Sequence, residues 1–295
     1  MGSKVTVSEV QPGFAAFVTG VDLTQPLISE DAMAIETAID RFGVLVFRDQ
    51  AINDDQQLVF ARAFGLIEDK RGGHIVAAKD ERLDAAINDI SNLDKNNNVL
   101  SRDNRQRLFN LGNQLWHSDS SFRAFPAKYS MLSGRQVPVN GGGNTEFADM
   151  CAAFDELDPD LSREAESLVC EHSLIYSREK LGFEPTQEEK KMFEPVRQRL
   201  VREHASTGRK SLYLSAHAGS IVGWPVPEAR IYLLDLMEHA VQRKFVYSHI
   251  WGNNDLIMWD NRCTMHRARR FDETQVRDMR RTTVAGDEMT AEQAA

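Results

Sequence analysis

Residues 115–122 read Leu115-Trp116-His117-Ser118-Asp119-Ser120-Ser121-Phe122, and they constrain the fold more than any other stretch. Residues i and i+2 of a β-strand point to the same face, so we expect a strand that directs His117 and Asp119 towards one ion. A third residue of the same kind, His266, lies far along the chain in Asp260-Asn261-Arg262-Cys263-Thr264-Met265-His266. The fold must therefore place a second, distant strand against the first.

Two imidazoles and one carboxylate form the facial set that binds non-haem Fe(II) in oxygenases, and they leave metal positions open for other ligands. A His-x-Asp pair alone recurs by chance, but Arg277 follows His266 by eleven residues and adds a cation suited to a carboxylate. Zinc accepts the same donors and stays an alternative. A zinc hydrolase would need a separate base, and the sequence contains no His-Glu-x-x-His motif to provide one.

The composition is that of an ordinary globular protein, with 42% hydrophobic and 27% charged residues among 295. The formal net charge of −9 argues against general binding to nucleic acid. No apolar run approaches the length of a membrane span, and the start of the chain lacks the pattern of a secretory signal. Three cysteines without C-x-x-C spacing favour free thiols in a reducing compartment, so we expect a cytoplasmic protein.

Local patterns predict alternating strands and helices. The valine-rich run Gly43–Arg48 predicts a buried strand, and Asn53 is a typical cap for a following helix that Gly65 ends. A longer helix over Pro227–Gln242 presents one apolar stripe, formed by Ile231, Leu234, Met237 and Val241. A further helix is expected near Met150–Leu157, and the other predicted strands are Lys128–Gly134, Asn144–Ala148, Phe245–Trp251, Leu256–Trp259 and Arg281–Val284.

Strands near the centre and end of the chain, with helices between them, predict a mainly β fold. We expect a double-stranded β-helix, or jelly roll, with helical insertions, built as one domain over residues 1–295. Residues 66–112 contain few apolar runs and predict a long active-site excursion or lid. The last residues, 285–295, predict a disordered tail.

Three segments together resemble the taurine dioxygenase family, and within it the 2,4-dichlorophenoxyacetate dioxygenase branch. They are Leu115–Phe122, Asn144-Thr145-Glu146-Phe147-Ala148-Asp149-Met150 and Met258-Trp259-Asp260-Asn261-Arg262-Cys263. The likeness extends from about Val21 to Val284. It implies a double-stranded β-helix that uses Fe(II), 2-oxoglutarate and O₂, with ascorbate as a helpful addition in assays. One departure is an apparent extra residue in Gly141-Gly142-Gly143-Asn144, just before Thr145.

The resemblance also implies roles for individual residues. His117, Asp119 and His266 match the iron ligands, Arg277 matches the arginine that pairs with the distal carboxylate of 2-oxoglutarate, and Thr145 matches a threonine that hydrogen bonds the same molecule. Arg281 matches the arginine expected to meet the acidic group of the substrate. If residues 277–281 are extended, Arg277 and Arg281 lie on one face of the strand.

The expected substrate is a small organic acid, and the branch implies an aryloxyalkanoate such as 2,4-dichlorophenoxyacetate. Its hydroxylation next to the ether oxygen would give a phenol and glyoxylate, with succinate and CO₂ from 2-oxoglutarate. Taurine, an alkylsulfonate or another carboxylate is the alternative within the family, and a non-catalytic metal-binding jelly roll is the alternative outside it. We expect a homo-oligomer. Further candidates for substrate contact are His74, Asn113, His204 and His217.

Overall fold

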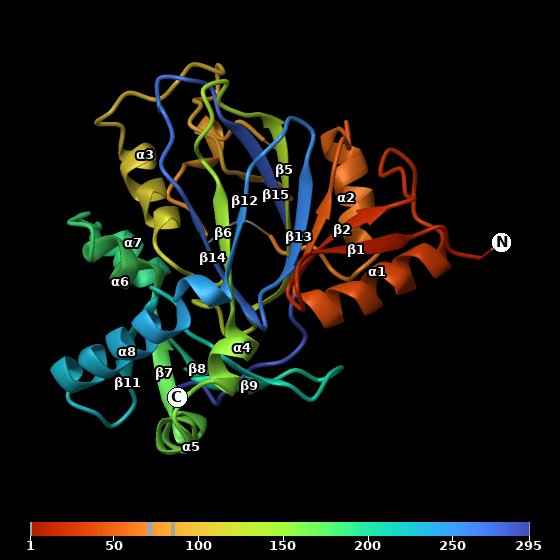
Figure 1. Cartoon of the computed structure of the whole chain (residues 1–295). Coiled ribbons are helices and arrows are strands. Elements are labelled where there is room, and N and C mark those ends of the chain that lie inside the picture. Colours follow the sequence, from red (N-terminus) through yellow and green to blue (C-terminus); the bar gives the residue numbers. More distant parts are fainter. Residues whose placement is uncertain (1, 70–72, 84–85, 295) are drawn as a thin grey trace.

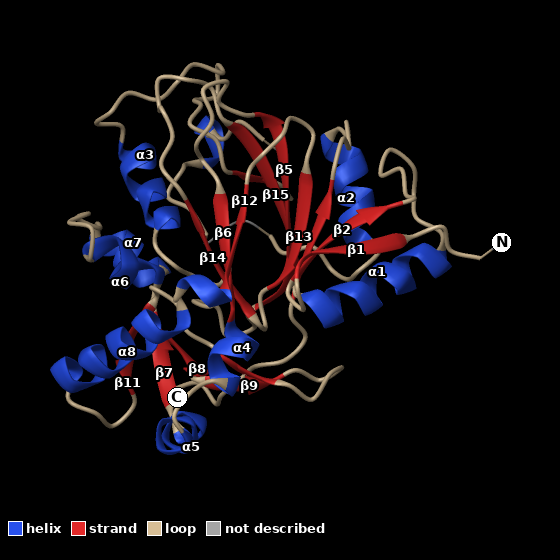
Figure 2. Cartoon of the chain, in the orientation of Figure 1, coloured by secondary structure: helices blue, strands red, loops and turns tan. Residues whose placement is uncertain are grey.

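The computed structural model describes residues 2–69, 73–83 and 86–294. Its largest sheet has seven strands, most of them antiparallel, which form the centre of the molecule (Figures 1 and 2). In spatial order they are β1 (Thr6–Gln11), β2 (Ala15–Thr19), β3 (Val44–Phe47), β13 (Leu256–Asp260), β5 (Ala127–Gln136), β15 (Asp278–Ala285) and β4 (Asn88–Asp89).

A three-stranded sheet lies against the large one (Figure 1). Its order is β12 (Val246–His249), β6 (Thr145–Asp149) and β14 (Thr264–Ala268), all antiparallel. Phe147 of β6 packs in one buried cluster with Val46 of β3 and Trp259 of β13, so the two sheets share an apolar layer. The structure thus contains mixed sheets and helices, with two antiparallel sheets packed face to face at the centre.

Strand β3 shows why its sequence is apolar at every position. Val44 and Val46 belong to the layer between the sheets, whereas Leu45 and Phe47 pack on the opposite face of the large sheet. A strand buried on both faces has no position for a polar residue. The predicted strand over Gly43–Arg48 is therefore confirmed, within one residue at each end.

Two helices cover that opposite face, α1 (Ser29–Phe42) and α2 (Asp54–Arg62) (Figure 1). The predicted cap at Asn53 is confirmed: its side chain accepts from the Gln56 N–H, and the Gln56 side chain accepts from the Asn53 N–H. This reciprocal pair satisfies two of the N–H groups that a helix start leaves free.

The helix predicted over Pro227–Gln242 is present as α8 (Val226–Ala240), but only half of its predicted apolar stripe meets the core: Met237 and Val241 pack against it, and the other two residues do not. Ile231 is 61% exposed and Leu234 is 49% exposed, whereas Ala229 and Leu233 are buried. The contact face of the helix is formed by Ala229, Leu233, Leu236 and Ala240. The packed cluster beneath it includes residues of α4, β7 and β11.

The remaining elements lie around the two packed sheets. The other helices are α3 (Arg105–Asn110), α4 (Met150–Asp155), α5 (Pro159–Ser167), α6 (Leu174–Glu179) and α7 (Gln187–Met192), with 3₁₀ turns at Ala78–Asp80, Leu111–Gln114 and Arg243–Phe245. Short strands β7 (Val169–His172), β8 (Val196–Arg199) and β11 (Ala218–Ile221) form one small sheet, and β9 (Val201–Glu203) and β10 (Lys210–Leu212) form another.

Two further features concern the ends and the surface of the chain. Within the expected tail 285–295, the Gln293 side chain accepts a hydrogen bond from the Arg197 N–H and donates one to the Arg197 carbonyl. The Thr290 hydroxyl donates to the Gln198 side chain, so both residues contact β8. Among the described residues, the helices are too short or too polar to cross a lipid bilayer.

Candidate metal centre and the two adjoining pockets

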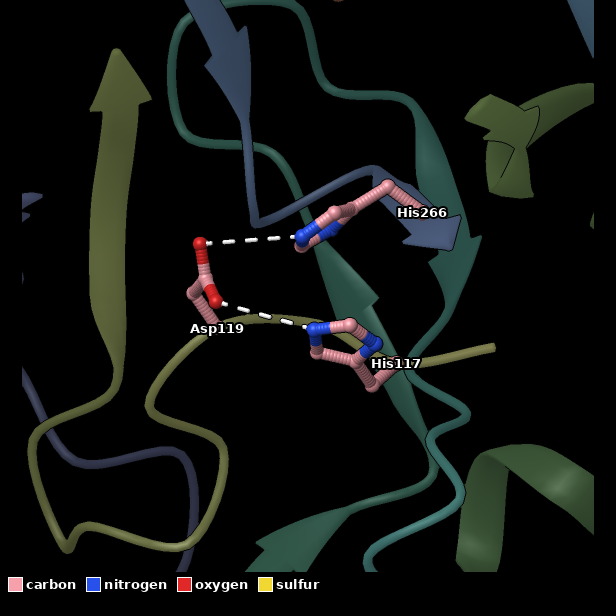
Figure 3. Close-up of side chains that lie close together, drawn as sticks. All are labelled: His117, Asp119 and His266. Atoms are coloured by element: carbon pink, nitrogen blue, oxygen red, sulfur yellow. Dashed lines mark ion pairs between the residues drawn. The ribbon is translucent and has the colours of Figure 1, made fainter. Parts of the chain in front are cut away.

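The structure brings His117, Asp119 and His266 together (Figure 3). His117 Nε2 lies 3.8 Å from Asp119 Oδ1, and His266 Nε2 lies 3.9 Å from Asp119 Oδ2. All three side chains are buried. The expectation of a regular strand at His117 and Asp119 was wrong, because His117 forms an isolated bridge with His266 and Asp119 lies in the turn that follows. The bridge itself sets the two imidazoles side by side, with ring centroids 4.2 Å apart.

The protonation of His117 suits it to bind a metal. Its Nδ1 lies 2.7 Å from the Leu115 carbonyl oxygen. Because a carbonyl oxygen only accepts hydrogen bonds, Nδ1 carries the proton and donates it in this hydrogen bond. Burial lowers the pKa of His117 to about 4, so the ring is neutral at pH 7 and Nε2 holds a lone pair. Burial also holds the pKa of His266 well below its usual value. Both imidazoles therefore offer a free nitrogen toward Asp119.

Asp119 is held by a chain of polar side chains that the sequence alone did not single out. Ser130 donates to Asp119 Oδ2 at 2.7 Å, and the Asn261 amide donates to the Ser130 hydroxyl at 2.9 Å. Arg281 Nη1 lies 2.5 Å from Asp119 Oδ1. Burial acts to raise the pKa of Asp119, but the charge of Arg281 and the hydrogen bond from Ser130 act to lower it; the pKa is lowered overall, and the carboxylate stays ionised.

This donor set fits a divalent iron. Two neutral imidazoles and one ionised carboxylate, buried and arranged around one point, are the ligands that non-haem Fe(II) takes with open positions left for other molecules. Partners that orient a ligand, as Ser130 orients Asp119 and Leu115 orients His117, are usual around metal sites.

His204 lies away from this centre, in a second cluster with Asp40 and Asp260. Its Nε2 is 2.9 Å from Asp260 Oδ2, and Arg262 donates to both carboxylates of the cluster. Arg262 supplies the positive charge there, so the cluster is a buried ion-pair network. The structure therefore does not bring His204 to the proposed substrate site.

Arg277 lies in a pocket of about 570 Å³, which we call the second pocket. Ala268 also lines it, two residues after the ligand His266 on the same strand, β14. The pocket is also lined by Asn92, Arg107 and Phe271. Arg277 is 5% exposed, its Nη2 donates to the Gly143 carbonyl at 3.2 Å, and burial lowers its pKa to about 10. Among the described residues, no carboxylate lies within 4 Å of its guanidinium.

The glycine run before Thr145 makes room for this arginine. Gly143 has φ +68°, and a Cβ built there would lie 3.0 Å from Arg277 Nε. Only glycine adopts that backbone without strain and leaves the guanidinium its place. Thr145 follows at the start of β6, opposite Ala268, which lines the second pocket. The Thr145 hydroxyl accepts a hydrogen bond from Trp251 Nε1 at 3.0 Å.

Arg281 lines a different pocket, of about 680 Å³, which we call the first pocket. His74 and Asn113 line it too, as does Arg178 of α6, which the sequence analysis did not identify. Nothing in the local sequence of α6 distinguishes this arginine from a surface residue. Asn113 and Ile90 line both pockets, so the two spaces adjoin each other.

His217 lies next to the metal centre. Its ring centroid is 5.8 Å from that of His117, and its Nδ1 is 3.0 Å from the Ser177 hydroxyl. Burial and the charge of Arg178 hold the pKa of His217 well below its usual value. A neutral His217 is therefore placed to pack against the ligand His117.

The expected excursion 66–112 supplies much of the wall of both pockets. His74, Arg82, Asn88 and Phe109 line the first pocket, and Asn92 and Leu100 line the second. The side chain of Asn92 also donates to the Gln275 carbonyl at 2.8 Å, and it accepts from the Arg277 N–H at 2.9 Å. These contacts tie the excursion to the loop before β15.

Comparison with known proteins gives a consistent result. Residues 6–283 match the family described as "Taurine catabolism dioxygenase TauD, TfdA family". The chain is 46% identical over 287 residues to the alpha-ketoglutarate-dependent 2,4-dichlorophenoxyacetate dioxygenase of Cupriavidus pinatubonensis, covering 96% of this chain and 99% of that one. It is 35% identical to the (S)-phenoxypropionate/alpha-ketoglutarate-dioxygenase of Sphingobium herbicidovorans, covering 97% of each.

A solved structure is similar over nearly the full length. It is a crystal structure of AAD-2 in complex with Mn(II) and N-oxalylglycine, with 56% sequence identity and a TM-score of 0.95. The match covers 99% of this chain and 100% of that chain.

Proposed function

The chain belongs to the TauD, TfdA dioxygenase family, and on that basis we propose that it is an Fe(II)- and 2-oxoglutarate-dependent dioxygenase of aryloxyalkanoic acids. A preferred substrate would be 2,4-dichlorophenoxyacetate or a close analogue, given the names of its relatives. The products would be a phenol, glyoxylate, succinate and CO₂.

One observation carries this proposal: the strand that holds the ligand His266 also lines, through Ala268, a pocket with a buried arginine that has no carboxylate partner among the described residues. The triad would bind iron, and Arg277 would bind the distal carboxylate of 2-oxoglutarate as a planar fork. A regulatory metal protein has no need for such an anion clamp, which makes the non-catalytic alternative the weaker one.

When bound, Fe(II) would supply the oxidation of the substrate C–H bond coupled to decarboxylation of 2-oxoglutarate. His117, Asp119 and His266 would hold it, and Ser130 would keep the carboxylate oriented. The first pocket would hold the organic acid next to the metal centre, because Arg281 spans from that pocket to Asp119. Thr145 would assist in cosubstrate binding, and His74, Asn113 and His217 would contact or shape the substrate.

The finer architecture is also part of the proposal. The two packed antiparallel sheets would be the halves of a double-stranded β-helix, in a single domain spanning the chain. Residues 66–112 would be the active-site lid, since they line both pockets. A homo-oligomeric state and a cytoplasmic location stay predictions.

A substrate panel tests the function. Purified protein with Fe(II), ascorbate and 2-oxoglutarate should consume 2-oxoglutarate and release succinate when 2,4-dichlorophenoxyacetate is added. Taurine and alkylsulfonates should stimulate it much less. Activity that persisted without oxygen would favour the zinc hydrolase, and metal binding without succinate from any acid or sulfonate would favour a non-catalytic protein.

A further inference from the structure

Of the arginines that the structure describes, Arg178 and Arg277 are the most buried, at 4% and 5% exposure. Neither has a carboxylate within 4 Å among the described residues, whereas Arg82, also largely buried, has two, Asp89 and Asp278. A buried guanidinium without a counter-ion is costly, and a bound anion would offset that cost. The proposed reaction needs two acids, 2-oxoglutarate and the substrate, and the described part of the chain contains two such arginines.

The guanidinium of Arg178 is fixed in position. Its Nε donates to the Phe109 carbonyl at 3.1 Å, and its Nη1 donates to the Ser177 hydroxyl at 2.8 Å. It stacks on the Phe109 ring, 4.6 Å from the centroid. A Cβ built on Gly112 would lie 2.4 Å from Arg178 Cζ, so the guanidinium also lies directly on the backbone there. A side chain held in this way is preorganised to bind a ligand.

Part of the fork remains available. Besides these two bonds, Nη2 makes a long contact of 3.4 Å to Asn113 Oδ1. Since a guanidinium has five N–H groups, about two remain for a ligand. Arg178 lines the first pocket, where these donors can be met by a carboxylate.

The other described arginines and lysines that line the first pocket already have carboxylate partners. Arg281 contacts Asp119, Arg82 contacts Asp89, and Lys95 contacts Asp80. Among the described arginines and lysines that line this pocket, Arg178 is thus the one without a carboxylate partner. Burial, together with the charge of Arg281, lowers the pKa of Arg178 to about 9, so it is still charged at pH 7.

We propose that Arg178 is the main binding residue for the carboxylate of the organic-acid substrate, with Arg281 in a secondary role because Asp119 already engages it. This rests on the proposed function and deepens it: Arg178 would be what restricts the enzyme to acids. The sequence resemblance assigned that contact to Arg281 alone.

The test compares 2,4-dichlorophenoxyacetate with its neutral amide in the full-length enzyme and in Arg178→Met, which keeps the length and removes the charge. We expect the acid-to-amide ratio of kcat/KM to fall by about 30-fold or more, as for loss of a buried charge partner. The KM for 2-oxoglutarate should stay within about twofold of the wild-type value. Arg135→Met is the matched control, since the Arg135 side chain is only 14% exposed but pairs with Asp54 and Gln57 away from the pocket.

A second pair of variants avoids changing Arg178, in case Arg178→Met does not fold. Asn113→Asp places a carboxylate where Asn113 Oδ1 now meets Arg178 Nη2, and so supplies a permanent counter-ion. Asn113→Ala removes the amide without adding charge. The acid-to-amide ratio should fall much further in Asn113→Asp than in Asn113→Ala.

The outcomes separate the two proposals. If the wild-type protein consumes no 2-oxoglutarate with any acid, the proposed function fails. If the wild type is active but a folded Arg178→Met keeps its acid-to-amide ratio, only this inference is overturned, and Arg281 alone recognises the charge. An equal fall in Asn113→Asp and Asn113→Ala would overturn it as well.

Discussion

Replacing Arg277 by methionine should separate the stability of the fold from the binding of 2-oxoglutarate. Burial lowers the pKa of Arg277 from its ordinary value to about 10, which corresponds to a cost of about 3 kcal/mol for keeping it charged. Because both values lie well above 7, that cost is present in full at neutral pH. Methionine removes the cost but leaves the carbonyls of Gly143 and Ile90 without a donor, at roughly 1–3 kcal/mol each.

These two effects oppose each other, so the ligand-free variant should unfold within a few degrees of the wild type. Ligand binding should change much more. Loss of the charged partner of a buried carboxylate costs at least about 2 kcal/mol, or about 30-fold in affinity. At a concentration that is about 100 times the wild-type Kd, 2-oxoglutarate stabilises the wild type by about 2.7 kcal/mol and the variant by only about 0.9 kcal/mol.

Thermal unfolding in the absence of oxygen, with Mn(II) and with or without 2-oxoglutarate, measures both quantities. The rise in Tm should be roughly 5 °C for the wild type and about a third of that for Arg277→Met. Arg277→Lys should recover part of the rise, because a point charge replaces a fork. Arg280→Met is the control on the same strand: Arg280 pairs with Asp54 and Asp278, and its loss should leave the ligand-induced rise unchanged.

A full ligand-induced rise in Arg277→Met would refute this reasoning and show that another residue holds the carboxylate. A ligand-free Tm that fell by more than about 10 °C would also contradict it, since Arg277 would then stabilise the fold despite its burial.

Alanine at any of the three proposed metal ligands, for example Asp119→Ala, should abolish turnover and Fe(II) binding and leave the far-UV circular dichroism unchanged; retained activity with bound iron would contradict the triad. Ser130→Ala should weaken metal affinity about 10–100-fold in a Mn(II) titration, because the carboxylate loses its orienting hydrogen bond, and an unchanged affinity would show that Ser130 has no such role. Asp260→Asn should destabilise the fold by about 3–5 kcal/mol in urea, since His204 and Arg262 lose their buried partner, with no change in the substrate KM. Despite burial, Arg262 and His204 lower the pKa of Asp260 in the folded protein, so the ionised carboxylate stabilises the fold at a pH above its unfolded pKa of about 3.8. The difference in unfolding free energy between wild type and Asp260→Asn should therefore shrink as the pH falls below about 4.

Local rules predicted those elements whose residues are determined by their own neighbourhood. The predicted cap at Asn53 forms as expected, and Gln56, three residues later, completes it. The run Val44–Phe47 is apolar at every position because both faces of β3 are covered. In each case the feature that decides the structure lies within a few residues.

The helix α8 shows where such rules fail. Its largest apolar residues suggested one face, but the packed cluster contains Ala229 and Leu233, while Ile231 faces outward. Amphipathic spacing gives the period of a helix, but the partner surface decides which side approaches closely. That surface is assembled from α4 and β7, which are distant in sequence, together with β11, which directly precedes α8.

The metal ligands were predictable by type, although the geometry assumed for them was wrong. The i, i+2 argument needs a regular strand, but Ser120 has φ +53° and Asp119 already lies in the turn. The carboxylate reaches the histidines because Ser130 and Asn261 orient it from β5 and the end of β13. A motif can thus identify donors correctly while the position of each donor depends on residues outside the motif.

Arg178 and Arg277 mark the limit of sequence reasoning more clearly. Arg277 was found because its spacing from His266 resembles a known pattern, whereas Arg178 has no pattern of its own. What makes Arg178 notable is a property of the folded chain: it is charged, buried and without a carboxylate among the described residues. A buried charge needs a partner that offsets its desolvation cost, and in a pocket a bound anion can be that partner. If so, the same criterion should identify substrate-anion sites in relatives whose sequences around α6 differ, since it depends on burial and pairing and not on any motif.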